Sequence, residues 1–309
     1  MINKIFIKIL NKFFKNYFDK KLLMLGTSHI LNMRKNYKNI SNLNEVDFKV
    51  FSQNGEDGII DYLLFSLQIE KPKFIEIGVG DYYESNTRFL FERSSGDGLI
   101  IDIIDNLQKR VEKNIRLWRG NVKILNRKID SENILATLKE FNFFDNIDLF
   151  SIDVDSIDYW ILEKMPKKFC KLIVAEYNPY FGSNLEISVP NDKNFDRSKY
   201  HHSNLCFGAS LKSIINLLDK KGFVFLGTNL FKNNAFFVNS DFKDNLFLEI
   251  PNNNELNSFT NASFRESRDI NNKLNFIDPK DILNEIKKCK VVDLSSSENK
   301  VKKIEDLLN

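Results

Sequence analysis

The stretch KFIEIGVGDYYESNTRFLFE, residues 73–92, decides the fold of this chain. Residues 74–77 read as a buried strand because the run is apolar except for one acid, Glu76. Gly78 and Gly80 follow at once and allow a sharp turn that is bare of side chains. A carboxylate inside a strand needs hydrogen-bond partners, such as the amides of the turn or a cationic ligand group. A strand, a glycine turn and a helix in this order predict the beginning of an α/β fold.

Short apolar runs alternate with helical patterns along the rest of the chain. Most runs are continuous, which is typical of strands that are covered on both faces. The pattern predicts a doubly wound, Rossmann-like α/β fold with a seven-stranded, mostly parallel sheet. The last two strands are too close for a crossover helix, so we expect an antiparallel hairpin at one edge. The predicted strands are 74–77, 99–101, 122–124, 149–152, 172–175, 224–226 and 235–238, and the predicted helices are 57–68, 86–93, 132–142, 157–164 and 209–221.

The two ends of the chain read as additions to this α/β domain. Asp278 before Pro279 predicts a short C-terminal helix, because the acid caps the first turn and proline suits its opening position. The run Ser295 to Glu298 has the form of a capping box and predicts a second helix. The expected regions are a helical N-terminal extension, 1–50, the α/β domain, 51–240, and a loop and helical C-terminal extension, 241–309.

Composition narrows the range of functions. The 309 residues include 45 basic and 42 acidic side chains, and this balance predicts no nucleic-acid partner. No apolar run reaches the roughly 18 residues of a membrane span. The three cysteines are far apart and fit neither a disulfide framework nor a CxxC metal site, which favours a reducing, cytoplasmic location. The three histidines are too few for a histidine-rich metal centre.

Residues 1–24 form a basic segment with apolar residues at helical spacing and lysines on the other face. The segment is charged throughout and has no small-residue cleavage site, so it does not read as a signal peptide. Such a helix packs on its own domain, lies on an anionic membrane surface or covers a partner. Peripheral membrane contact through residues 1–24 is therefore one of three expectations.

The turn after the first strand and the end of the second strand together predict a ligand site. Ligands of doubly wound sheets bind beyond the carboxyl ends of the strands. Asp102 ends the second strand, in GLIIDIID, and a carboxylate there can accept both hydroxyls of a ribose. The alternative is that the two glycines only form a tight turn. Tyr82 stands where a third glycine would be, which argues against an ordinary NAD site, and GxxxxGK[ST] is absent from the sequence.

These residues resemble class I S-adenosylmethionine-dependent methyltransferases, and further stretches narrow the resemblance to the FkbM-like branch. The resemblance runs from about residue 51 to 238 and covers neither end of the chain. The stretches are FSQNGEDGII (51–60), FIEIGVGD (74–81), SNT (85–87), LFSIDVDSIDYWIL (149–162), LIVAEYNP (172–179), FGASLKSI (207–214) and NAFFV (234–238).

The resemblance implies S-adenosylmethionine as the cofactor. It assigns the ribose to Asp102 and the methionine moiety to the turn after the first strand. Two points depart from the family pattern: Val79 to Tyr82 stand where relatives have an acid or tryptophan followed by Asp-Gly, and Asp155-Ser156 replace Asp-Gly. The residues implied at the cofactor are Glu76, Gly78, Gly80, Asp81, Asn86 and Asp102.

An acidic cluster follows the fourth and fifth strands. Asp153, Asp155 and Asp158 come at the end of the fourth strand, and Glu176 and Asn178 at the end of the fifth. Oxygen ligands from adjacent strand ends suit Mg²⁺, and this layout resembles metal-dependent O-methyltransferases of the catechol type. The expected metal ligands are Asp153, Glu176 and Asn178. The alternative is that Asp155 and Asp158 cap the next helix.

Methyl transfer to a hydroxyl needs an aligned acceptor and a base. The base candidates are Asp153, Asp155, His201 and His202, with both histidines in a polar loop, residues 195–211, that is expected to cover the site. In the same loop, Arg197 is a candidate for substrate binding, as is Tyr200.

The leading hypothesis is O-methylation of a small polyol or sugar, an acceptor class implied by the family resemblance, as in surface polysaccharides or natural-product intermediates. One alternative is a glycosyltransferase that uses Asp153-Val154-Asp155 as a DxD motif with a metal and a nucleotide sugar. Another is a non-catalytic binding protein with a decayed cofactor site.

Overall fold

The computed structural model describes residues 2–251, 253–260, 262, 266–296 and 298–308, and the side chains of 2–9, 11–13 and 253–255 lie outside this description. The strands are β1 (Lys73–Ile77), β2 (Asp97–Asp102), β3 (Asn121–Asn126), β4 (Ile147–Ile152), β5 (Cys170–Glu176), β6 (Ile187–Ser188), β7 (Phe223–Thr228), β8 (Asn234–Asn239), β9 (Lys290–Asp293) and β10 (Lys300–Lys303). The helices are α1 (Ile2–Met33), α2 (Glu56–Ser66), α3 (Arg88–Ser94), α4 (Leu107–Asn114), α5 (Ile134–Glu140), α6 (Asp158–Lys164), α7 (Arg197–Tyr200), α8 (Leu211–Lys220) and α9 (Pro279–Ile286).

The predicted seven-stranded, mostly parallel sheet is confirmed, in the order β3-β2-β1-β4-β5-β8-β7. The pairs among β3, β2, β1, β4 and β5 are all parallel. Strand β8 runs antiparallel to both of its neighbours, β5 and β7. The expected hairpin therefore lies at one edge, with its second strand inserted between β5 and β7. Helix α4 was not predicted; only three of its eight residues are buried, which leaves a weak apolar pattern.

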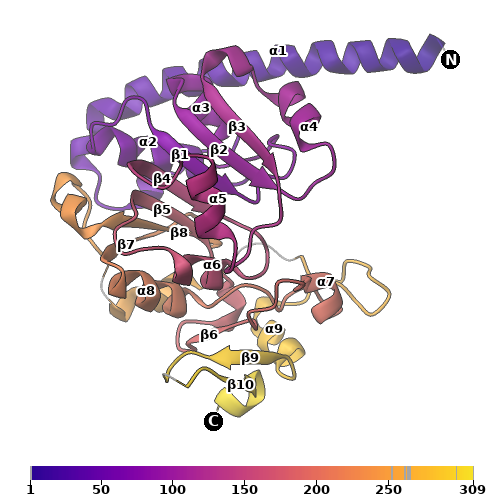
Figure 1. The fold of residues 1–309 in the computed structure, drawn as a ribbon, viewed down its shortest axis with the longest axis vertical. Coiled ribbons are helices and arrows are strands. Elements are labelled where there is room, and N and C mark those ends of the chain that lie inside the picture. Colours follow the sequence, from indigo (N-terminus) through magenta and orange to yellow (C-terminus); the bar gives the residue numbers. More distant parts are fainter. Residues whose placement is uncertain (1, 252, 261, 263–265, 297, 309) are drawn as a thin grey trace.

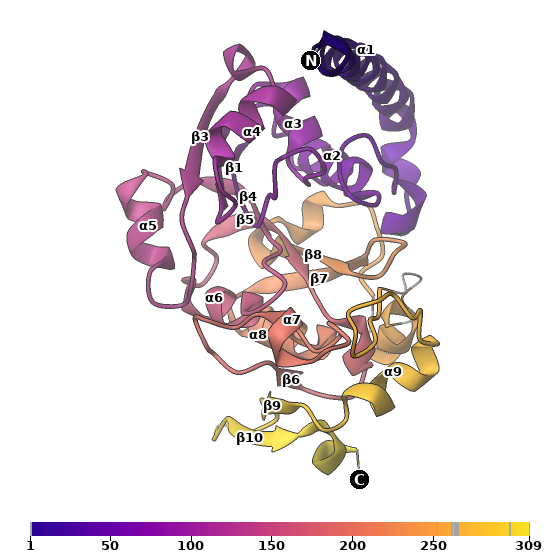
Figure 2. The same ribbon diagram turned by 90° about the vertical axis from the view of Figure 1, so that its right-hand side faces the viewer.

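Helices cover both faces of this sheet, so the domain has three layers (Figures 1 and 2). Alternate strand residues point to opposite faces, which divides the apolar interior into two cores. One core joins Ile75, Leu99 and Ile173 to helices α5, α6 and α8. The other joins Phe74 and Ile100, with further strand residues, to α2, α3 and α4.

Helix α1 is longer than the predicted segment and extends to Met33. Its N-terminal part projects past the body of the molecule (Figure 1). Near its C-terminal end, Ile30 packs with Val50, Phe51 and Phe89 in a small apolar cluster. Among the described residues, no helix is both long and apolar enough to cross a membrane.

The C-terminal segment forms a second sheet at the opposite end of the molecule from α1 (Figures 1 and 2). Strands β9 and β10 pair antiparallel, and β9 also pairs with β6 from the middle of the chain. The predicted helix at Asp278 is confirmed, since that side chain caps α9. The second predicted helix is wrong: Ser295, Ser296 and Glu298 lie between β9 and β10, and Ser297 is outside the described residues.

The described core under this second sheet contains residues that are far apart in the sequence. Residues of the segment between β5 and α8 pack against α9 and β9 there. We call this cluster the second core; its buried residues are Tyr180, Phe181, Ile187, Val189, Leu205, Cys206, Ala262, Ile282, Ile286, Cys289, Val291 and Ile304.

Candidate functional site

The register of the parallel strands brings the predicted site residues to one edge of the sheet. Ile77 of β1 lies between Ile101 of β2 and Ile152 of β4. The residues that follow these three are Gly78, Asp102 and Asp153, so they leave the sheet side by side. Ile152 in turn pairs with the last-but-one residue of β5, which places Glu176 beside Asp153.

A cavity of about 710 Å³ opens at this edge. Gly78, Gly80 and Asp102 line one side of the cavity, and Asp153, Asp155 and Glu176 line another. Further lining residues include Asp192, Phe195 and Arg197, of which the last two lie in the predicted covering loop, and Glu266 from a C-terminal segment. The cavity therefore lies where ligands bind in doubly wound sheets.

Glu76 is held by the loop that follows it. One carboxylate oxygen accepts a hydrogen bond from the backbone N–H of Asn86 at 2.9 Å. The other accepts from the hydroxyl of Ser85 at 2.6 Å and from the backbone N–H of Thr87 at 2.9 Å. Burial raises the pKa of Glu76, and these hydrogen bonds oppose the shift. The acid inside the strand thus fixes the approach to α3, although it also lines the cavity.

The two glycines of the turn serve different purposes. Gly78 has a φ of 87°, and a Cβ there would lie 1.6 Å from the carbonyl oxygen of Asp153. Only a residue without a side chain allows β1 and β4 to end so close together. Gly80 has a φ of 54°, and a Cβ there would meet no atom within 4 Å. Gly80 faces the cavity, so its backbone is open to a ligand.

Asp102 connects the ends of β1 and β2. One of its oxygens accepts a hydrogen bond from the backbone N–H of Gly80 at 2.7 Å, and the other accepts from Ile104 N–H at 2.9 Å. Each carboxylate oxygen has a further lone pair, and Asp102 is only partly buried. The carboxylate is therefore oriented by the protein and still able to accept from a ligand hydroxyl.

The remaining residues implied at the cofactor also lie around this turn. Asp81 and Asn86 line the cavity. The amide group of Asn86 donates to the hydroxyl of Ser151 at 3.1 Å, which fixes its orientation. Tyr82 is fully buried in the core on the α2 side, and its hydroxyl lies 2.7 Å from that of Thr87. The tyrosine that replaces a third glycine therefore does not fill the cavity.

Three carboxylates face one another on the other side of the cavity. One oxygen each of Asp153, Asp155 and Glu176 lies within 4.8 Å of the others. Burial and then repulsion from Asp153 raise the pKa of Glu176 well above its usual value. Burial and then repulsion from Asp155 do the same to the pKa of Asp153. Arg197 is a counter-charge, with its guanidinium 2.7 Å from Asp155.

Two residues that were predicted to belong to this cluster, Asp158 and Asn178, form hydrogen bonds with backbone groups instead. Asp158 accepts hydrogen bonds from the N–H groups of Val154 at 2.8 Å and Ser156 at 3.1 Å, and burial raises its pKa to about 6. Asn178, expected as a metal ligand, donates to two backbone carbonyls at 2.9 Å each and accepts from Tyr180 N–H at 3.0 Å. Asn178 is not among the cavity-lining residues. Its position before Pro179 was a turn signal that could have indicated this role.

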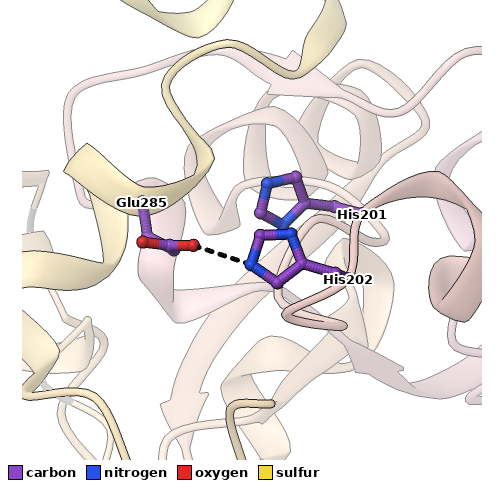
Figure 3. A group of neighbouring side chains, drawn as sticks. All are labelled: His201, His202 and Glu285. Atoms are coloured by element: carbon purple, nitrogen blue, oxygen red, sulfur yellow. Dashed lines mark ion pairs between the residues drawn. The ribbon is translucent and has the colours of Figure 1, made fainter. Parts of the chain in front are cut away.

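The structure does not bring the two histidines to the cavity. His201 and His202 are not among the residues that line it, and they lie beside Glu285 of α9 (Figure 3). Burial and then the neighbouring His202 lower the pKa of His201. Tyr200 likewise points elsewhere, because its hydroxyl donates to the carbonyl of Lys290. Of the four base candidates, only Asp153 and Asp155 line the cavity.

Several lining residues had no signal in the sequence. Glu266 contacts Arg197 at 3.6 Å from a C-terminal segment, and no motif marks it. Asn54 and Asn233 also line the cavity and are joined by a hydrogen bond of 3.1 Å. Asn54 lies in a stretch that carries the family resemblance, and Asn233 directly precedes another such stretch. This position in the sequence was the one indication that they belong to the site.

No protein-family model matches the chain, and none of the curated proteins matches it. Solved structures that it resembles include an O-methyltransferase family protein from Burkholderia thailandensis, at 12% identity and a TM-score of 0.35 over 60% of this chain and 58% of that one. Another is an S-adenosylmethionine-dependent methyltransferase from Clostridium acetobutylicum, at 11% identity and 0.37 over 59% and 88%. A third is human N-acetylserotonin methyltransferase in complex with S-adenosylmethionine, at 13% identity and 0.33 over 57% and 49%.

Proposed function

We propose that the protein is an S-adenosylmethionine-dependent methyltransferase of the FkbM-like branch. The observation that carries the proposal is the open backbone at Gly80, held by Asp102 and facing a cavity that also contains ionisable groups. The cavity volume lies within the roughly 300–1,000 Å³ of small-molecule sites. The sequence resemblance supports the same assignment.

The cofactor residues have separate tasks in this proposal. When bound, S-adenosylmethionine supplies an electrophilic methyl group. Asp102 would accept from the ribose hydroxyls, and the bare turn at Gly78 and Gly80 would hold the amino-acid end. Asn86, oriented by its bond to Ser151, would face the same end. Glu76 keeps this loop in place through its own hydrogen bonds, and it is a positioning residue.

Asp153 and Glu176 would provide the base. Repulsion between neighbouring carboxylates keeps one proton on the pair over a wider pH range than for isolated acids. The ionised member can then accept the proton of an acceptor hydroxyl, and a pKa nearer to neutral makes it a better base. Arg197 and Asp155, which pair at 2.7 Å, would bind further hydroxyls of a polyol or sugar. The acceptor class itself comes from the family resemblance.

Mg²⁺, where it binds, would be held by the same cluster, and it would then replace the Asp153–Glu176 base by lowering the pKa of the acceptor hydroxyl. The carboxylates of Asp153, Asp155 and Glu176 are ligands of the kind that it prefers. A cation would compete with Arg197 for Asp155, and it would lower the pKa of all three acids. Addition of Mg²⁺ and of a chelator therefore belongs in every activity measurement.

The glycosyltransferase alternative keeps one supporting observation, since Asp153 and Asp155 of the DxD sequence both line the cavity. Isothermal titration of the purified chain, together with a methyl-transfer assay, distinguishes the three functions. We expect S-adenosylmethionine and its demethylated product to bind. Binding of a nucleotide sugar with Mn²⁺, but of neither sulfur ligand, would favour the glycosyltransferase. Binding of the cofactor without transfer to any of a panel of sugars would favour the non-catalytic protein.

We also propose that the protein is cytoplasmic and contacts an anionic membrane surface through residues 1–24. The described part of this helix exposes an apolar stripe, with Leu10 at 37%, Phe14 at 51% and Phe18 at 58% exposure. Lys20 and Lys21 are exposed as well. Co-sedimentation with vesicles tests the proposal: anionic vesicles should retain the full chain, and Phe14→Ser with Phe18→Ser should release it. Equal binding to uncharged vesicles would contradict the role of the lysines.

A further inference from the structure

Both histidines of the covering loop meet a glutamate from the C-terminal helix α9, away from the cavity (Figure 3). A ring nitrogen of His201, a ring nitrogen of His202 and a carboxylate oxygen of Glu285 all lie within 4.8 Å of one another. The Nε2 atom of His202 is 3.0 Å from Glu285 Oε1. The two imidazole rings are 4.3 Å apart and inclined by 35°.

The ring of His201 is held in place by Ser203. Its Nδ1 atom lies 2.7 Å from the hydroxyl of Ser203, which is fully buried. The backbone N–H of Ser203 also approaches Nδ1, at 3.3 Å. Among the described residues, no hydrogen bond reaches Nε2 of His201. The backbone N–H of Ser203 donates to Nδ1 in this tautomer, so binding of an ion at Nε2 requires the ring proton to move to Nδ1, from which it can be donated to the hydroxyl of Ser203.

We propose that His201, His202 and Glu285 bind a divalent first-row transition ion, of which Zn²⁺ is the best fit. Two imidazoles and one carboxylate are a ligand set of tetrahedral zinc sites that keep water in the fourth position. Zinc–ligand distances of about 2.0–2.1 Å place neighbouring ligands about 3.3 Å apart. The His202–Glu285 distance is already near this value. Small rotations can bring in the third ligand, because His202 and Glu285 are 38% and 34% exposed.

The ion would connect two segments that build the second core. Glu285 lies on α9, whose Ile282 and Ile286 are buried in that core. His201 directly follows α7, and the first residue of α7 is Arg197, which pairs with Asp155 at the cavity. Metal binding would therefore hold the covering loop against the C-terminal segment. Without the ion, one exposed His–Glu pair would contribute little to this contact.

Metal titration of the full chain, with any affinity tag removed, tests the site. After treatment with a chelator, and with excess Mg²⁺ present to occupy the acidic cluster at the cavity, we expect one equivalent of Zn²⁺ to bind and to raise the melting temperature. Co²⁺ in its place should give the visible absorption of a tetrahedral complex. The substitutions His202→Gln and Glu285→Gln should each weaken Zn²⁺ binding by at least about tenfold. Their circular dichroism without metal should match that of the unaltered chain.

Three matched variants exclude other ligands. His29→Gln removes the third histidine of the chain and should bind Zn²⁺ normally. Cys289→Ser removes a thiol that interacts with Cys206 in the second core, and Asp153→Asn disrupts the acidic cluster at the cavity. Both should also bind normally. The proposal is overturned if the chain binds no Zn²⁺, if His202→Gln and Glu285→Gln bind as well as the unaltered chain, or if any of the three controls loses binding.

Discussion

Glu76 and Glu176 are both glutamates at the carboxyl end of a parallel strand, and their surroundings are opposite. Glu76 accepts hydrogen bonds from the backbone N–H groups of Asn86 and Thr87 and from hydroxyl groups. Glu176 faces the carboxylates of Asp153 and Asp155. Burial raises the pKa of both acids, but hydrogen bonds oppose the shift at Glu76, whereas repulsion adds to it at Glu176.

This difference distinguishes an acid that holds its loop in place from one that we propose takes part in the chemistry. A carboxylate surrounded by donors is stable as the anion and holds its loop in place. A carboxylate among other carboxylates is costly to the fold, and such groups are often found at functional sites. In the proposed function, one side of the cavity would hold a ligand, and the other side would exchange a proton with it.

The largest effect is expected where the two sides touch, at Gly78. Gly78→Ala places a Cβ 1.6 Å from the carbonyl of Asp153 and should cost more than about 4 kcal/mol of stability. Gly80→Ala is the matched control, because the same change meets no atom there. Because the φ of Gly80 is 54°, alanine should cost about 1–2 kcal/mol there, far less than at Gly78, and the variant should bind S-adenosylmethionine more weakly. Urea unfolding and calorimetry measure the two effects; equal stability of both variants would contradict the close contact.

Removal of the structural acid should be the next largest change. Glu76→Ala leaves two backbone N–H groups and two hydroxyls without their acceptor, at a cost of about 3–5 kcal/mol. Urea unfolding against Glu249→Gln, an exposed control, measures the loss. A decrease below about 1 kcal/mol would show that the loop does not depend on this carboxylate.

Glu176→Gln should lower activity without destabilising the chain, whereas Glu76→Ala is expected to destabilise it. Methyl transfer is expected to fall by about 10²–10⁴-fold, while cofactor affinity is unchanged. Because the pKa of Glu176 is raised in the folded protein, its ionised form destabilises the fold as the pH rises through that pKa. The variant should therefore gain stability relative to the parent at pH 8 and not at pH 4. Activity like that of the parent would exclude Glu176 as part of the base.

The pH profile of transfer should report the Asp153–Glu176 pair. Their pKa values are raised, so the rate is expected to fall on acidification at a pH above the usual carboxylate range. A profile that is flat down to pH 5 would contradict the proposed base. Glu249→Gln should leave the profile unchanged.

The smallest of these effects concerns the ribose. Asp102→Ala removes a charge-assisted acceptor and should weaken cofactor binding by about 10- to 100-fold without unfolding the chain. Asp105→Ala, three residues on and exposed, should bind normally. Calorimetry with S-adenosylhomocysteine measures both. Unchanged affinity of Asp102→Ala would show that the ribose is held elsewhere.

The strands could be predicted because each is a short apolar run between breaker residues, and their parallel order followed from the intervening helices. The C-terminal hairpin could not be predicted, since KVVD and KVKK are too short and too polar for a strand signal and form only by pairing with β6 and with each other.

The site could be predicted in part. The sequence pattern placed Asp102 and Glu176 at the ends of strands, and the cavity lies there. It did not separate Glu176 from Asn178, because the acceptors and donors that occupy Asn178 belong to backbone groups up to 29 residues away.

The most direct measurement is a crystal structure of the chain with S-adenosylhomocysteine. We predict its ribose hydroxyls on the carboxylate of Asp102 and its amino-acid end over the backbone of Gly78 and Gly80. A ligand found away from these strand ends would contradict the account. So would a failure to bind S-adenosylhomocysteine by a chain that takes up a nucleotide sugar with Mn²⁺ at Asp153 and Asp155.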